Sequence, residues 1–232
     1  MNRAMIDHER LTRWYDFQAP IYHYWRDDYD GSLIAAVSGL LSDNHEGSPK
    51  KALDVGCGSG LLAIGLGQKH PDWEITGVDP SAGLLKIARR EAGKRGLTKV
   101  VFAEGVVARL AYQGAEFDLV VAAGLFPNIN DHLGALVEIK RVLKPDGTLA
   151  IIEFDRTNLG APGRVFFNVM IMGYRLFSWA FRCFRFADDW NIEKSTIDTE
   201  AFLATLSQAG FRIHARHHAG DHVIFVLGNV ES

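Results

Sequence analysis

The stretch Leu53-Asp54-Val55-Gly56-Cys57-Gly58-Ser59-Gly60 decides the fold of this chain. An apolar run typical of a buried strand ends at Asp54, and glycines then alternate through the residues that follow. A second apolar run further along the chain ends in another acid, Asp79. An acid-ended strand, a glycine-rich turn and a second acid behind them are the parts of a nucleotide-binding loop.

The glycine spacing is G-x-G-x-G, whereas dinucleotide-binding loops carry G-x-G-x-x-G. This difference favours a ligand with one nucleoside, and methyl transfer over hydride transfer. Gly56 and Gly58 would let the backbone approach such a ligand without a Cβ clash. Free amides after Ser59 would bind a carboxylate. Asp79 would accept hydrogen bonds from ribose hydroxyls, and Pro80 would pack on the base. The alternative is a tight strand–helix turn with a cap.

Composition limits the class of protein. The chain has 232 residues, enough for one large α/β domain or two small ones, and its 47% hydrophobic content excludes general disorder. A net charge of −3 gives no field that would recruit nucleic acid. Two cysteines make no disulfide framework, which indicates a reducing compartment. The chain contains no run of about 20 uncharged apolar residues, so we expect no membrane-spanning helix. We therefore expect a cytoplasmic protein.

The order of elements predicts an open sheet. Residues 9–41 have helical periodicity, and residues 42–50 form a polar linker. Beyond them, strands alternate with helices and are apolar throughout, which is typical of a parallel sheet covered on both faces. The predicted strands are 51–55, 73–78, 100–103, 117–122 and 148–154, and the predicted helices are 61–69, 82–95 and 132–143.

The C-terminal part differs from this alternation. An amphipathic helix at 199–209 precedes two strands, 211–215 and 223–227, whose short connection requires an antiparallel pair. Four histidines gather around this hairpin. We expect no metal there, because no cysteine or carboxylate pair has ligand spacing and neighbouring strand residues face opposite ways.

Several motifs resemble those of the class I S-adenosylmethionine-dependent methyltransferases, in particular the subfamily that methylates quinones, lipids and other small molecules. They are Leu53–Gly60, Val78–Ser81, Phe117–Val121, Arg141–Leu149 and Gly210–Phe211. The resemblance implies a Rossmann-like α/β fold, with seven strands in the order 3-2-1-4-5-7-6, strand seven antiparallel and helices on both faces. It also implies a helical cap over residues 1–48 and a cofactor-binding domain over 49–232, with a helical lid inserted at about 158–195.

The same resemblance assigns S-adenosylmethionine as the cofactor. The residues expected to bind it are Tyr15, Asp54, Gly56, Cys57, Gly58, Gly60, Asp79, Pro80, Glu104, Val106 and Ala123. One position departs from the family. Where an acid often contacts the adenine amino group, this chain has Val106, so a backbone carbonyl or Glu104 would take that contact. The lost hydrogen bond would weaken binding by about 1–2 kcal/mol.

The acceptor side is expected to come from the least typical segments. Tyr15-Asp16-x-x-Ala19-x-x-Tyr22 resembles the cap helix of small-molecule methyltransferases, in which one tyrosine touches the cofactor and the other lines the acceptor pocket. Both tyrosines lie on one helical face, and the alternative is an aromatic stripe packed on the core. The candidate catalytic residues are Tyr22, His23 as a base and Asn128 as a polar contact.

Residues 164–186 form an apolar segment with a narrow, arginine-rich polar face. Three interpretations stay open for it: a core helix, a lid over an apolar acceptor, and a helix in the membrane interface. An interfacial helix would place the protein at the inner face of a membrane.

The expected function is methyl transfer to oxygen or carbon of a small, apolar, quinone-like or lipid-like acceptor, without nucleic acid. The sequence carries no signal for an oligomeric state. Two other functions are kept open. A nicotinamide-dependent oxidoreductase would explain the glycines and Asp79, but no Tyr-x-x-x-Lys pair follows the fourth strand. A non-catalytic cofactor-binding or membrane-surface protein would fit the departure at Val106.

Overall fold

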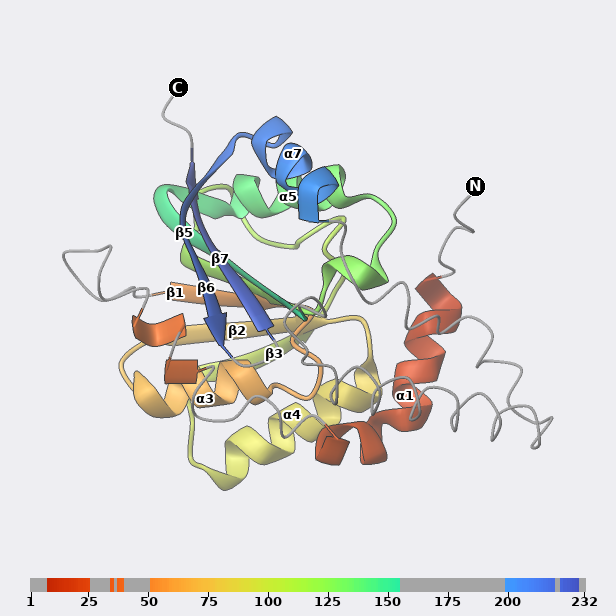
Figure 1. The fold of residues 1–232 in the computed structure, drawn as a ribbon. Helices are drawn as coiled ribbons and strands as arrows, with labels where there is room; N and C mark the ends of the chain where they lie inside the picture. Colours follow the sequence, from red (N-terminus) through yellow and green to blue (C-terminus); the bar gives the residue numbers. More distant parts are fainter. Residues whose placement is uncertain are drawn as a thin grey trace.

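The fold is built on one seven-stranded sheet in the order β3-β2-β1-β4-β5-β7-β6 (Figure 1). The computed structural model describes residues 8–25, 34–35, 37–39, 51–154, 199–219 and 222–229. Strands β1 to β5 pair in parallel, and β7 runs antiparallel to both β5 and β6. This confirms the predicted fold class and strand order. The strands are β1 (Lys51–Val55), β2 (Glu74–Asp79), β3 (Val100–Glu104), β4 (Phe117–Ala123), β5 (Leu143–Phe154), β6 (Phe211–Ala219) and β7 (His222–Asn229).

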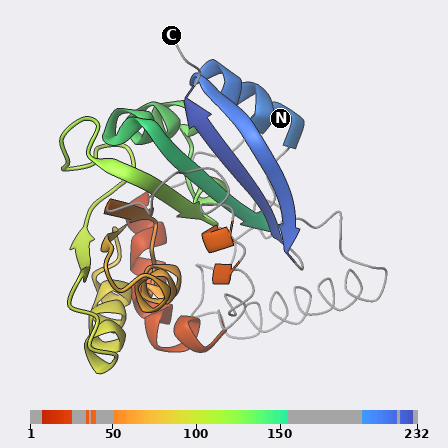
Figure 2. The ribbon, with the colours of Figure 1, turned by 90° about the vertical axis from the view of Figure 1, so that its left-hand side faces the viewer.

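Helices cover both faces of the sheet (Figures 1 and 2). They are α1 (His8–Trp25), α3 (Leu61–Lys69), α4 (Ala82–Lys94), the 3-10 turn η1 (Phe126–Asn128), α5 (His132–Val142) and α7 (Thr199–Gln208). Helices α5 and α7 lie on one face, and α3 and α4 on the other, with α1 packed against α4.

Side-chain alternation along the strands explains the two layers. On β4, Val120 points into the core beneath α5 and α7, whereas its neighbours Leu119 and Val121 point into the core beneath α3. All three are fully buried. A strand that buries both faces must be apolar throughout, which is why the central strands read as continuous apolar runs.

The main difference from the sequence prediction lies at the start of β5. We predicted a helix that ends at residue 143 and a strand that begins at residue 148, with Pro145 and Gly147 in the connection between them. In the structure β5 begins at Leu143, which pairs with Phe117, and the next pair is Leu119 with Thr148. Residues 144–147 of β5 lie between these two pairs, and the register of the pairing shifts across them. Pro145 and Gly147 therefore interrupt the regular pairing of β5 without ending the strand.

The predicted N-terminal helix is only partly covered. Helix α1 ends at Trp25, and residues 34–35 and 37–39 are again helical. The predicted lid at 158–195, including the segment 164–186, lies outside the described residues. Within the described ranges, no helix combines the length and the apolarity needed to cross a membrane.

Candidate active site

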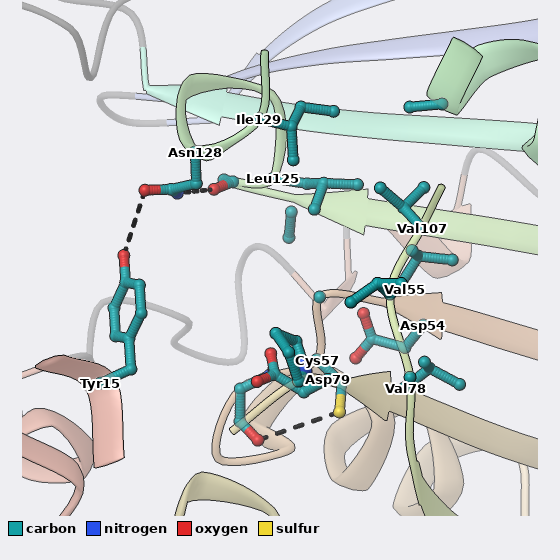
Figure 3. A pocket seen from close by; sticks show the side chains of 18 of the residues that line it. Tyr15, Asp54, Val55, Cys57, Val78, Asp79, Val107, Leu125, Asn128 and Ile129 are labelled. Carbon is teal, nitrogen blue, oxygen red and sulfur yellow. Dashed lines mark hydrogen bonds between the residues drawn. The ribbon is translucent and has the colours of Figure 1, made fainter. Parts of the chain in front are cut away.

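A cavity of about 450 Å³ opens at the carboxyl ends of β1, β2 and β4. Its wall comes from the loops that follow β1, β2, β3 and β4, from the first turn of α5, and from one face of α1. Figure 3 shows Tyr15 entering from α1 on one side and Asp54 and Asp79 facing the cavity from the sheet. Parallel strands bring the ends of β1 and β2 to the same edge, as the sequence predicted.

The loop after β1 is held against β2 by its own backbone. The amides of Gly56 and Cys57 both donate to the Val78 carbonyl, at 2.7 and 3.1 Å. Gly56 and Gly58 have φ values of 74° and 53°, in the left-handed region that favours glycine. Gly56, Cys57 and Gly58 all line the cavity. The backbone is therefore presented to a ligand at close range.

Gly60 has a packing role at the start of α3 that the sequence did not indicate. It is the N-cap of α3 with a φ of 77°, and it is not among the lining residues. A Cβ at this position would lie 2.7 Å from the Phe102 ring and 2.8 Å from Ala88. Gly60 thus allows α3 to pack closely against β3 and α4, and its predicted contact with the cofactor stays a prediction.

Asp79 is buried at the end of β2 with both carboxylate oxygens engaged by backbone amides. Oδ2 accepts from Gly58 N at 2.9 Å, and Oδ1 accepts from Ser81 N at 2.8 Å. Burial raises the pKa of Asp79, while these two amides act to lower it. Each oxygen retains a second lone pair, so the carboxylate can still accept hydrogen bonds from a ligand on the cavity side.

Asp54 is more deeply buried, with 2% of its surface exposed. Its Oδ2 atom has no hydrogen-bond partner among the described residues. Burial raises the pKa of Asp54 to about 7, opposed by a hydrogen bond from the Ala63 backbone and reinforced by the charge of Asp79. A buried carboxylate oxygen without a donor is costly, so this atom is a place for a donor supplied by a ligand.

The wall near β3 is apolar. Pro80, Leu84 and Val106 line the cavity, and Val106 is 49% exposed. Glu104 pairs with Asp79 in the β-ladder, is exposed, and does not line the cavity. The structure therefore does not bring Glu104 to the place of the acid that Val106 replaces.

Tyr15 and Asn128 form a polar pair on the opposite wall (Figure 3). The Tyr15 hydroxyl donates to Asn128 Oδ1 at 3.3 Å, and Asn128 Nδ2 donates to the Gly124 carbonyl at 2.8 Å. The second bond fixes the orientation of the amide, so Asn128 does not simply face water. Ala123, also predicted, lines the cavity beside this pair.

Sequence reasoning missed part of this wall. Leu11 and Thr12 face the cavity from α1, and Asp131 and Gly134 face it from the start of α5. The first pair had a signal, because both precede Tyr15 by about one helical turn. Tyr22 and His23 belong to α1, but their side chains lie outside the described residues, so their catalytic roles stay predictions.

The chain resembles known methyltransferases along most of its length. The methyltransferase domain family matches residues 53–151. The demethylmenaquinone methyltransferase of Thermus thermophilus is 36% identical over 188 residues, which cover 76% of this chain and 84% of that protein. The chain belongs to the S-adenosylmethionine-dependent methyltransferases.

Three further comparisons add to this similarity, one in sequence and two in fold. The demethylmenaquinone methyltransferase of Deinococcus radiodurans is 41% identical over 119 residues, 51% of this chain and 49% of that protein. A SAM-dependent methyltransferase from Aquifex aeolicus superimposes with a TM-score of 0.60 at 18% identity, covering 86% and 98% of the two chains. The SpnF cyclase superimposes with a TM-score of 0.71 at 19% identity, covering 99% of both chains. These structures share the fold alone.

The cofactor of this methyltransferase is S-adenosylmethionine, and the cavity fits it. The cofactor carries ribose hydroxyls and an ammonium group, both of which are hydrogen-bond donors. Asp79 has lone pairs left for the hydroxyls, and Asp54 Oδ2 is a buried acceptor without a described donor. The apolar residues Pro80, Leu84 and Val106 offer a surface for the adenine ring. The individual binding roles stay predictions.

Proposed function

We propose that this methyltransferase transfers a methyl group to oxygen or carbon of a small, apolar, quinone-like ring. The observation that carries the proposal is the character of the acceptor-side wall, in which the apolar side chains of Leu11, Leu125 and Ile129 lie beside the hydrogen-bonded Tyr15–Asn128 pair. The names of the two relatives described above, both demethylmenaquinone methyltransferases, support the same class of acceptor.

The charges of the wall disfavour an anionic acceptor. Among the described residues, the cavity wall carries no Lys, Arg or His side chain. A phosphate or carboxylate on the acceptor would therefore find no cationic partner on this part of the wall, and its desolvation would be uncompensated. Leu11, Leu125 and Ile129 instead offer an apolar surface that suits a ring. A reduced quinone, which is neutral and carries two hydroxyl groups, meets both requirements.

The chemistry is a displacement at the methyl carbon. When bound, the cofactor supplies a methyl group on a sulfonium, so that the new bond to the acceptor forms as the carbon–sulfur bond breaks. The protein's part is to align the acceptor and exclude water, which contributes up to about 7–11 kcal/mol in well-oriented systems. Tyr15 and Asn128 are placed to orient an acceptor hydroxyl by hydrogen bonds.

A proton must leave the acceptor during or after the transfer. On a reduced quinone, loss of the hydroxyl proton leaves an electron pair on oxygen, which can take the methyl group directly. The same loss also pushes electron density onto the neighbouring ring carbon; once that carbon is methylated it gives up its own hydrogen as a proton, and the ring oxygen takes a proton back. His23 and Tyr22 are our candidates for receiving this proton. A lipid-soluble acceptor would be reached at a membrane surface, and residues 164–186 are our candidate for contact with that surface. Peripheral membrane contact is therefore part of the proposal.

Methyl transfer to defined acceptors tests the proposal. Purified protein is incubated with labelled S-adenosylmethionine and, in parallel, with a prenylated 1,4-naphthoquinol lacking its ring methyl, a catechol, and phosphatidylethanolamine. We expect label in the naphthoquinol or catechol, with mass spectrometry locating it on carbon or oxygen. Label only in the amine lipid would contradict the proposed acceptor class. If adenosylhomocysteine binds but no label reaches any of these three acceptors or a crude lipid extract tested in the same way, the result supports a non-catalytic protein instead.

A further inference from the structure

The carboxylate of Asp16 in α1 accepts two hydrogen bonds from the start of α4. Asp16 Oδ1 accepts a hydrogen bond from the Ser81 hydroxyl at 2.6 Å and another from the Gly83 amide at 2.8 Å. Ser81 is itself the N-cap of α4, because its hydroxyl accepts from the Leu84 amide at 3.1 Å. Asp16 therefore supplies a second, charged acceptor to a helix N-terminus whose free amides favour negative charge.

The backbone at Gly83 independently marks this contact as closely fitted. A Cβ at Gly83 would lie 3.0 Å from Asp16 Oδ1, 3.2 Å from Asp16 Cα and 3.3 Å from the Asp16 carbonyl oxygen. Two of these atoms belong to the α1 backbone, which cannot give way as a side-chain tip can. A side chain at Gly83 would therefore require α1 to move by a few tenths of an ångström.

Ser81 connects this contact to Asp79, the carboxylate at the end of β2. Ser81 is 1% exposed and makes two donations, from its hydroxyl to Asp16 Oδ1 and from its backbone amide to Asp79 Oδ1. One buried serine thus joins the acid of α1 to the acid predicted to bind ribose. A displacement of α1 would free the Ser81 hydroxyl and change the support of Asp79.

The same helix reaches the other side of the cavity through the preceding residue. Tyr15 donates to Asn128, and Leu11 and Thr12 line the cavity from the preceding turn of α1. Figure 3 shows the tyrosine bridging from α1 to the loop after β4. Helix α1 is therefore held at the loop after β2 by Asp16 and at the loop after β4 by Tyr15, with the cavity between them.

We infer that Asp16 is a positioning residue for the cofactor: it seats α1 as a wall of the cavity and, through Ser81, holds Asp79 in place. Asp16 does not line the cavity, so it acts on the ligand only through these neighbours. This inference concerns the cofactor and is independent of which acceptor is methylated. Removal of the Asp16 carboxylate therefore weakens cofactor binding and speeds cofactor release.

The test is adenosylhomocysteine binding to the full chain with Asp16→Ala, Asp16→Asn and Gly83→Ala. Asp16→Ala removes a charge-assisted acceptor, and we expect Kd to rise roughly tenfold, mainly through faster dissociation. Asp16→Asn keeps an oxygen at the same place and should restore most of the affinity. Gly83→Ala leaves every hydrogen-bonding group in place but pushes α1 away, and it should resemble Asp16→Ala.

Glu9→Ala is the matched control, since Glu9 is an exposed acid on the same helix that pairs with Arg13. It should leave Kd unchanged. Hydrogen exchange of residues 8–25 adds a readout that general destabilisation does not mimic: adenosylhomocysteine should protect α1 in the wild type and in Asp16→Asn but not in Asp16→Ala. If Asp16→Ala binds as tightly as the wild type with α1 equally protected, the inference is overturned. It is also overturned if Asp16→Asn is as impaired as Asp16→Ala.

Discussion

The Tyr15 hydroxyl donates a hydrogen bond to Asn128 Oδ1 over 3.3 Å and so joins the N-terminal helix to the loop after β4. Tyr15→Phe removes this bond and keeps the ring. Because a neutral hydrogen bond is worth about 0.5–1.5 kcal/mol, we expect kcat/KM for the acceptor to fall roughly 2- to 12-fold. Kd for adenosylhomocysteine should rise by no more than the same factor, because the Tyr15 ring stays in the wall and Asp16 still holds α1 at α4.

Tyr112→Phe is the control for this change, because the Tyr112 ring packs edge-on against Phe117 and does not line the cavity. Steady-state kinetics with saturating cofactor separate the two substrates. If the acceptor kinetics of Tyr15→Phe match those of Tyr112→Phe, the Tyr15–Asn128 pair does not contribute to acceptor binding or turnover.

Cofactor binding should depend on the protonation of Asp54. Its pKa, raised to about 7 by burial, leaves the carboxyl largely protonated below that pH. The ionised form attracts the cofactor's ammonium group, so affinity should rise as pH increases through about 7, with release of a proton. Calorimetry of adenosylhomocysteine binding in buffers of different ionisation enthalpy measures that proton. In Asp54→Asn the pH dependence and the proton release should both disappear.

The same group predicts how stability varies with pH. A carboxyl whose pKa is higher in the folded state binds protons more tightly there than in the unfolded chain. Its contribution to the free energy of unfolding is therefore most favourable below pH 3.8, the ordinary value, and is lost as pH rises to about 7. Relative to Asp54→Asn, the ligand-free wild type should lose stability in urea melts between pH 5 and pH 8. An unchanged difference between the two proteins would contradict the raised pKa.

Gly60→Ala tests whether this glycine serves packing or ligand binding. The added methyl group would lie 2.7 Å from the Phe102 ring on a backbone with a φ of 77°. We expect a loss of about 1–3 kcal/mol in the free energy of unfolding. The folded fraction should bind adenosylhomocysteine within a few-fold of the wild type.

Gly93→Ala is a suitable comparison for Gly60→Ala, since it lies within α4 with no atom within 4 Å of an added Cβ. It should raise stability by about 0.5–1 kcal/mol, because alanine is the better helix former. Equal effects of the two substitutions in denaturant melts would argue against the packing role of Gly60.

Much of the fold was predictable because its signals are local. The acid-ended apolar run 51–55, the glycine loop and the closely spaced C-terminal strands each predict one element, and the family resemblance supplied their order. The start of β5 was missed for the opposite reason. Pro145 and Gly147 are turn formers in their own right, and only pairing with Phe117 shows that the strand begins before them.

The site divides in the same way. Asp54, Gly56, Gly58 and Asp79 were singled out because strand ends and glycine spacing are visible in the sequence, and all four line the cavity. Gly60 belongs to the same pattern, yet its task depends on Phe102, a residue of β3 that spacing alone does not bring near. Asp16 had no chemical signal at all, because its importance comes from the N-terminus of α4.

Calorimetric titration of adenosylhomocysteine into Asp79→Asn and Glu74→Gln tests the central claim, that the acid at the end of β2 holds the ribose. Both acids lie on β2, one at each end, and Glu74 is exposed. Losing hydrogen bonds to a charged acceptor costs about 1.5–3 kcal/mol, so Asp79→Asn should weaken binding roughly 10- to 150-fold. Wild type and Glu74→Gln should bind one equivalent with equal affinity. Folded wild-type protein that gives no binding heat and no thermal shift, or Asp79→Asn that binds as tightly as Glu74→Gln, would contradict the account.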